Sequence, residues 1–277
     1  MYRTLITPQE LKAILDSTVL VDCRFDLTNP RAGEQAYAAG HLPSAVYASL
    51  DRDLSSEITP TTGRHPLPDP QRLADTFGRW GIDEGRQVVA YDADAGAYAA
   101  RLWWLLRWLG HDSVAVLSGG FNAWQTAGLP VNTAVATPTP AKFAAHVRPN
   151  AFVTAEQVAA LVQQPNWRVL DARGPERFSG QVEPIDPVAG HIPGACNFPF
   201  VRNLGADACV LPAGELAVRY RDALGATAPD HVVAMCGSGV TACHLLLAME
   251  HAGLTGATLY AGSWSEWIRD PNRPIAP

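Results

Sequence analysis

Short hydrophobic runs alternate along the chain with segments of helical periodicity. Runs rich in β-branched residues, such as VLVD at 19–22 and VVAY at 88–91, are apolar almost throughout. Strands that are buried on both faces of a parallel sheet have this pattern. The segments TPQELKAIL at 7–15 and TAEQVAALV at 154–162 begin with Thr and carry Glu or Gln shortly after it, as helices with a capping box do. The alternation predicts an α/β fold whose mainly parallel sheets have helices on both faces.

The same segments occur twice, in the same order. Four pairs match at offsets between 143 and 150: VLVDCR (19–24) with RVLDAR (168–173), GHLPSA (40–45) with GHIPGA (190–195), QVVAYD (87–92) with HVVAMC (231–236), and LSGGFNAW (117–124) with YAGSWSEW (260–267). Repeated units of this size indicate a tandem duplication. We expect one domain over 1–131, a linker rich in Thr, Pro and Ala over 132–150, and a second domain over 151–277.

Composition and charge narrow the classes of partner. The 277 residues are 47% hydrophobic and carry a formal net charge of −6, without a long run of Lys or Arg. Nucleic acids and anionic membranes attract concentrated positive charge, so neither is an expected partner. No run of about 18 apolar residues and no signal peptide is seen, and we expect a cytoplasmic protein. The cysteine count is odd, at five, which favours reduced thiols over a disulfide framework.

Cys236 follows an apolar run and precedes Gly237, Gly239 and the start of a helical segment. In an open parallel sheet, ligands bind where a strand runs into a helix N-terminus. Glycines let the backbone N–H groups curl toward an anion, and the helix N-terminus adds positive potential. Such an environment lowers a thiol pKa and makes the thiolate available. The position therefore favours a nucleophilic cysteine.

Other roles for Cys236 fit its neighbours less well. A metal site needs three or four ligands, and no Cys or His cluster accompanies it, so no metal site and no cofactor are expected. A CxxC pair is absent, although Cys243 lies seven residues on and leaves a redox role open. A cysteine-dependent phosphatase needs an arginine where Ala242 stands. A buried packing cysteine remains the plain alternative.

Together, the duplicated halves, the Asp-x-Arg and Gly-His-Ile-Pro-Gly segments, the CGSGVT loop at 236–241 and the closing GSWSEW resemble the two-domain rhodanese-type sulfurtransferases. The resemblance covers essentially the whole chain. It implies that Cys236 accepts a sulfane sulfur, becomes a persulfide and passes the sulfur to an acceptor. It also implies a catalytically silent first half, where Asp92 occupies the place of Cys236. The site is then expected in a cleft between the domains.

An uncharged CGSGVT loop resembles the branch that uses 3-mercaptopyruvate, whereas thiosulfate enzymes carry Arg and Lys after the cysteine. The expected acceptor is a small thiol, a thioredoxin-like protein or cyanide. Thiosulfate:cyanide sulfur transfer and a non-catalytic persulfide carrier stay open as alternatives. The residues expected to bind the donor are Arg177 and, in the loop, Gly237, Gly239, Val240 and Thr241.

Members of the mercaptopyruvate branch also have an Asp–His–Ser relay. The resemblance implies that Asp51, His65 and Ser238 form this relay here. A histidine that titrates near pH 7 suits proton transfer. A turn residue at Asp51, a surface-loop residue at His65 and a structural ion pair at Arg177 remain open. The second arginine of that branch is missing, because Ile185 and Asp186 stand in its place. The sequence leaves open whether another residue replaces it, and Arg64 and Arg202 are the candidates.

The remaining motif residues are expected to be architectural. The Asp-x-Arg pairs should connect strand ends to loops, and the histidines of the Gly-His-x-Pro turns should satisfy buried backbone groups. The run RLWWLLRWLG at 101–110 is apolar all round, which predicts a buried helix or one packed at a domain interface.

Overall fold

The computed structural model describes residues 1–277 and divides into two compact units. The first comprises Met1–Ser56, Leu67–Arg148 and Gly205–Val210, and the second comprises Glu57–Pro66, Pro149–Leu204 and Leu211–Pro277. Each unit therefore includes a short segment from the other half of the sequence. The segment Glu57–Pro66 carries two residues of the candidate site, Arg64 and His65, into the second unit.

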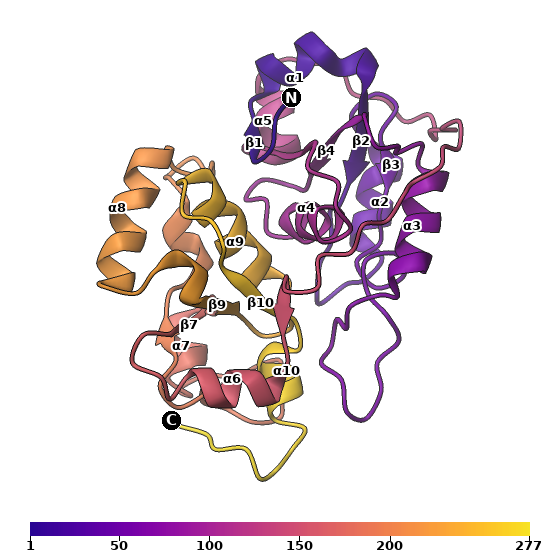
Figure 1. The fold of residues 1–277 in the computed structure, drawn as a ribbon. Helices are drawn as coiled ribbons and strands as arrows, with labels where there is room; N and C mark the ends of the chain where they lie inside the picture. Colours follow the sequence, from indigo (N-terminus) through magenta and orange to yellow (C-terminus); the bar gives the residue numbers. More distant parts are fainter. The chain divides into compact units, whose positions relative to one another are not determined.

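The first unit is built on a five-stranded parallel sheet (Figure 1) with the strand order β1-β5-β4-β2-β3. The strands are β1 (Leu5–Ile6), β2 (Thr18–Asp22), β3 (Val46–Tyr47), β4 (Gln87–Tyr91) and β5 (Val114–Leu117). The central strand β4 is buried along its whole length, as expected for the apolar run that follows Gln87.

Helices cover both faces of this sheet: α1 (Pro8–Ile14), α2 (Ala32–Ala39), α3 (Pro70–Arg79), α4 (Ala99–Trp108) and α5 (Gly120–Thr126). Leu11 of α1 and Trp124 of α5 pack on the face that carries Leu20 and Val89. Nine of the ten residues of α4 are buried, which confirms the predicted buried helix.

A second five-stranded parallel sheet, ordered β6-β10-β9-β7-β8, forms the other unit. Its strands are β6 (Phe152–Val153), β7 (Arg168–Asp171), β8 (Cys196–Asn197), β9 (Val232–Met235) and β10 (Thr258–Tyr260). The order repeats that of the first sheet strand for strand. The predicted α/β fold with parallel sheets is therefore confirmed, and so is the duplication.

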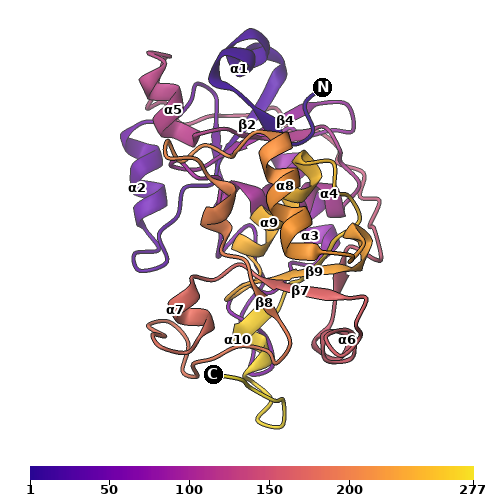
Figure 2. The same cartoon turned by 90° about the vertical axis from the view of Figure 1, so that its left-hand side faces the viewer.

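The helices of the second unit are α6 (Ala155–Leu161), α7 (Pro175–Phe178), α8 (Ala213–Leu224), α9 (Thr241–His251) and α10 (Ser263–Trp267). Figure 2 shows β7 and β9 between α8 and α9 on one side and α6 and α10 on the other. Trp264 and Trp267 of α10 pack with Val158 of α6 beneath this sheet. No helix of the chain is long and apolar enough to span a bilayer.

Local motifs behave alike in both units. Thr7 and Thr154 form the predicted capping boxes at the starts of α1 and α6. The Asp-x-Arg pairs are buried, and each arginine also reaches the Gly-His-x-Pro turn, Arg24 at Gly40 O and Arg173 at Gly190 O. The turn histidines contact backbone carbonyls, and each stacks on an aromatic ring. These motif residues connect strand ends to turns, as expected.

Candidate active site

Cys236 lies directly after β9, at the start of the loop 236–240 that leads into α9. Its side chain is buried, with only 2% of the residue exposed. The Gly239 N–H donates to the Cys236 Sγ over 3.1 Å. The loop thus directs a backbone hydrogen-bond donor at the sulfur.

The turn that begins α10 is hydrogen-bonded to this loop. The Cys236 N–H donates to Ser263 Oγ over 3.0 Å, and Cys236 O accepts from the Trp264 N–H over 3.0 Å. Gly237 O accepts from the Ser265 N–H over 2.9 Å. Five backbone groups of the loop and the turn are therefore paired across this junction, which limits how far Cys236 can move.

Gly239 must be a glycine for two separate reasons. Its φ of +76° lies in the left-handed region that side chains rarely adopt. A Cβ at this position would lie 2.2 Å from Ala261 O, which no side chain can tolerate without a backbone shift. The close approach brings the loop against the end of β10 and directs the Gly239 N–H at the sulfur.

The structure brings Ser238 and His65 together within the second unit. His65 Nδ1 and Ser238 Oγ lie 2.8 Å apart, and both residues are more than nine-tenths buried. The segment that carries His65 is fixed on the α10 turn, because the Arg64 N–H donates to Ser265 Oγ over 3.0 Å. His65 is therefore not a surface-loop residue, because its side chain is buried and contacts Ser238.

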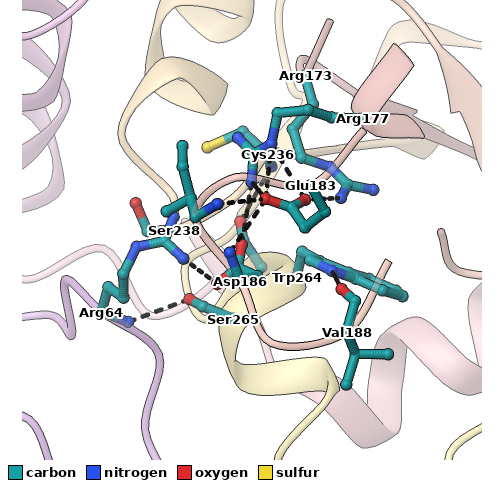
Figure 3. A network of polar contacts seen from close by, with 12 residues as sticks. Arg64, Arg173, Arg177, Glu183, Asp186, Val188, Cys236, Ser238, Trp264 and Ser265 are labelled. Atoms are coloured by element: carbon teal, nitrogen blue, oxygen red, sulfur yellow. Dashed lines mark hydrogen bonds and ion pairs between the residues drawn. The ribbon is translucent and has the colours of Figure 1, made fainter. Parts of the chain in front are cut away.

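Arg177 projects from α7 toward the Cys236 loop and is held by two carboxylates (Figure 3). Its Nε donates to both oxygens of Glu183, over 3.0 and 3.1 Å, and its Nη2 donates to Asp186 Oδ2 over 3.0 Å. Burial works against the charge of Glu183, but hydrogen bonds from Arg177 and from backbone N–H groups outweigh it and lower the pKa of this carboxyl. Arg177 thus makes the ion pairs left open by the sequence.

Arg64 is the second arginine at this site. Its Nη1 pairs with Asp186 Oδ1, so that Asp186 connects Arg64 and Arg177. Burial raises the pKa of Asp186, and Arg64 opposes this effect. The other candidate, Arg202, is exposed and stacks over the ring of Phe198 at 4.6 Å. Of the two arginines, the structure therefore places only Arg64 beside Arg177.

In the first unit, the equivalent loop holds a carboxylate where the second has a sulfur. Asp92 follows β4 and accepts hydrogen bonds from the backbone N–H groups of Gly96, Tyr98 and Ala99, over 2.9, 2.8 and 3.2 Å. Phe121 and Asn122 of α5 bond the carbonyls of Asp92 and Ala93, just as α10 does at Cys236 and Gly237. The chain's own carboxylate thus fills this anion-binding loop, although burial raises the pKa of Asp92.

Replacing Asp92 by alanine should destabilise the first unit by about 2–3 kcal/mol, because three backbone N–H groups lose their acceptor. Chemical denaturation of both proteins measures the difference. Asp94→Ala is a matched control, since Asp94 is exposed and bonds only the neighbouring Ala95 N–H. Its effect should stay within about 0.5 kcal/mol. Equal losses from both substitutions would contradict a structural role for the Asp92 carboxylate.

The remaining residues discussed for the site from the sequence are in and after the Cys236 loop, apart from Asp51. Val240 is buried and caps α9, and Thr241 is the first residue of that helix. Cys243 is completely buried and its Sγ donates to Gly239 O over 3.3 Å. Asp51 belongs to the first unit and is exposed, so its place in a relay stays a prediction.

Sequence reasoning missed Glu183 and Ser263 and left the contribution of Arg64 open. Glu183 follows Arg177 by six residues, which was a usable signal for an ion pair. Ser263 has a φ of +54°, and its Oγ joins Cys236 N to Tyr260 O. The first-half counterpart of Ser263 is Gly120, with a φ of +56°, so the internal repeat already marked this strained position.

Comparison with known proteins places this geometry in a family. The rhodanese-like domain model matches residues 7–127 and 154–270. The chain is 48% identical over 276 residues to a protein of Pseudomonas aeruginosa named as a probable 3-mercaptopyruvate sulfurtransferase, covering 98% of this chain and 97% of that one. It is 39% identical over 281 residues to a Mycobacterium tuberculosis protein named as a putative thiosulfate sulfurtransferase, covering 99% of this chain and 96% of the other.

A solved structure agrees with these relatives. The 3-mercaptopyruvate sulfurtransferase of Leishmania major superimposes with a TM-score of 0.85 at 32% identity, over 97% of this chain and 76% of that one. The relatives named here are all sulfurtransferases, and the family model matches both halves of the chain. The predicted family is confirmed, and the chain belongs to the rhodanese-like sulfurtransferases.

Proposed function

We propose that the chain transfers the sulfur of 3-mercaptopyruvate, through a persulfide on Cys236, to a thiol or cyanide acceptor. The observation that carries this proposal is the loop at Cys236, where a backbone N–H meets the sulfur and two arginines lie alongside. The N–H is directed at the sulfur that attacks, and the arginines suit the carboxylate of a keto acid. The first unit, with Asp92 in the equivalent loop, is proposed to be silent, because a carboxylate cannot accept sulfur.

The proposed reaction has two displacement steps. The Cys236 thiolate attacks the sulfur of mercaptopyruvate, so that an S–S bond forms while the C–S bond breaks. The electron pair of the C–S bond moves to the leaving carbon and gives the enolate of pyruvate, which takes up a proton to form pyruvate. An acceptor thiolate or cyanide then attacks the outer sulfur of the persulfide and releases the Cys236 thiolate. No external oxidant or reductant is consumed in this sequence.

Ser238 and His65 are proposed to move the proton in the first step. Their 2.8 Å contact lies two residues from the nucleophile, and a histidine changes charge in the range where such transfer is useful. Asp51 is the proposed third member, which would orient His65. Ser238 gives a proton to the enolate as it leaves, and His65 supplies that proton to Ser238.

The charges around the loop favour a monoanionic donor. The positive charges of Arg64 and Arg177 are balanced by Glu183 and Asp186, so the pair presents directed donors without a net positive excess. A dianion such as thiosulfate gains more from net positive charge than a keto acid does. The Pseudomonas and Leishmania relatives carry 3-mercaptopyruvate in their names, which supports the same donor. The Mycobacterium relative is named for thiosulfate, and it makes thiosulfate:cyanide transfer the second candidate.

Steady-state rates with both donors test the proposal. The kcat/KM for mercaptopyruvate, followed as pyruvate release, should exceed that for thiosulfate by at least about tenfold, or 1.4 kcal/mol in the transition state. A higher value for thiosulfate would overturn the donor assignment. Transfer that stops after one sulfur per chain, with a small thiol in excess, would instead support a carrier that needs a protein partner such as a thioredoxin-like acceptor.

The relay makes a separate prediction about Ser238 and His65. Ser238→Ala and His65→Gln should each lower kcat with mercaptopyruvate by about 10²-fold, because each interrupts the same proton path. The double variant should lose no more than about threefold beyond either single variant, since groups that act as a unit are not additive. Stopped-flow pyruvate release measures all three variants. Losses that multiply in the double variant would show that the two side chains act independently.

A further inference from the structure

Asp186 holds two guanidinium groups side by side at the Cys236 loop (Figure 3). One carboxylate oxygen pairs with Arg64 Nη1 and the other accepts from Arg177 Nη2. Glu183 binds the same edge of Arg177, through Nε and Nη2. Both guanidinium groups are therefore held in place by acidic partners.

The nitrogens that remain free face the loop. A Cβ on Gly237 would lie 2.9 Å from Arg64 Nη2 and 3.4 Å from Arg177 Nη1. Neither of these two nitrogens donates a hydrogen bond to the protein. In addition, Arg64 Nε is buried and has no acceptor. Since buried donors in folded proteins are normally satisfied, the buried Arg64 Nε–H indicates an acceptor that the chain does not supply, and the two Nη groups beside Gly237 are placed to bind the same acceptor.

Arg64 is also held firmly enough to bind a ligand. Its own N–H donates to Ser265 Oγ, and a Cβ on the preceding Gly63 would lie 2.5 Å from Gly262 O. The following residue, His65, contacts Ser238 in the Cys236 loop. The backbone around Arg64 is thus packed against the same turn that fixes Cys236. A pre-positioned guanidinium loses little conformational entropy when it binds an anion.

We infer that Arg64 binds the carboxylate of the sulfur donor together with Arg177, and that Asp186 is the residue that positions both. This inference rests on the proposed function for the identity of the donor. Two guanidinium groups that offer free N–H donors to one point suit a planar carboxylate, which has two oxygens to share between them. A carboxylate bound against Gly237 also lies next to Cys236 in the chain, which keeps the donor sulfur near the nucleophile.

The test compares two donors that differ only in the carboxylate. Mercaptopyruvate carries it, and 1-mercapto-2-propanone has a methyl group in its place. Arg64→Gln should lower kcat/KM for mercaptopyruvate by about 10- to 100-fold, mainly through KM, because a charge-assisted hydrogen bond is lost. The same variant should change kcat/KM for 1-mercapto-2-propanone by less than about threefold. Arg64→Lys keeps the charge and should recover part of the loss.

Arg202→Gln is the matched control, since it removes the same charge from an exposed arginine that stacks on Phe198. It should leave both donors unaffected. Asp186→Asn should also raise KM for mercaptopyruvate, because Arg64 and Arg177 both lose the carboxylate that positions them. Equal losses with both donors in Arg64→Gln, or no loss in either, would overturn the assignment of Arg64. Failure of the unmodified protein to release pyruvate from mercaptopyruvate would instead contradict the proposed function itself.

Discussion

Cys236→Ser should reduce sulfur transfer by about a thousandfold or more while the protein stays folded, because a hydroxyl oxygen cannot hold a sulfane sulfur. Serine preserves the size and the hydrogen-bonding capacity of the side chain, so the Gly239 N–H keeps an acceptor. Turnover with mercaptopyruvate measures the loss, and thermal unfolding shows whether the fold is intact.

Cys243→Ser is the control for this experiment. Cys243 is fully buried in the first turn of α9, and a serine hydroxyl can replace its bond to Gly239 O. Activity should stay within about threefold of the unmodified protein. If both substitutions abolish transfer equally, the two cysteines act as a redox pair and a persulfide on Cys236 alone is contradicted.

Gly239→Ala should lower both stability and activity. The alanine Cβ would lie 2.2 Å from Ala261 O. The alanine backbone would also have to adopt the left-handed conformation, with a φ of +76°. We expect a loss of about 3 kcal/mol or more in the free energy of unfolding. The shift needed to relieve the clash also moves the N–H away from the Cys236 sulfur, so kcat should fall in the fraction that remains folded.

Gly253 separates the two effects, because it has the same φ of +76° but a Cβ there would have no atom within 4 Å. Gly253→Ala should therefore cost only the backbone term, about 1 kcal/mol, and leave kcat unchanged. Urea denaturation of both variants gives the comparison. Similar losses at the two positions would show that the contact with Ala261 O does not constrain the loop.

Much of the fold was predictable because it depends on local patterns. The apolar runs and capping boxes mark strands and helices within a few residues, and the internal repeat indicates that the two sheets share one strand order. The sequence also predicted that Cys236 and its glycines lie between a strand and a helix, since the strand, loop and helix that position them are contiguous.

The parts that could not be predicted depend on contacts between distant segments. Arg64 and Asp186 are 122 residues apart, and no local pattern indicates that they pair. Their meeting depends on the packing of Glu57–Pro66 with the second unit, which the predicted boundaries at 131 and 151 did not include. The missing second arginine after Glu183 was visible in the sequence, but the sequence could not choose between Arg64 and Arg202, because Arg64 comes from the other half of the chain.

The loops at Asp92 and Cys236 share one backbone arrangement but carry different side chains. In both units a helix turn bonds the carbonyls of the residue after the strand and of its neighbour. The Asp92 carboxylate accepts hydrogen bonds from the backbone N–H groups of its own loop, whereas Cys236 places a sulfur at the equivalent point. The first loop is thus satisfied internally, and the second retains a polarisable atom that can form a new bond.

The most direct test is the mass of the protein after incubation with mercaptopyruvate in the absence of an acceptor. We expect the intact chain to gain the mass of one sulfur atom, peptide mapping to place it on Cys236, and one pyruvate to be released for each chain. Addition of cyanide or a thiol should remove the extra mass. Pyruvate release without any gain in mass, or a gain that maps to a different cysteine, would contradict a Cys236 persulfide as the carrier of sulfur.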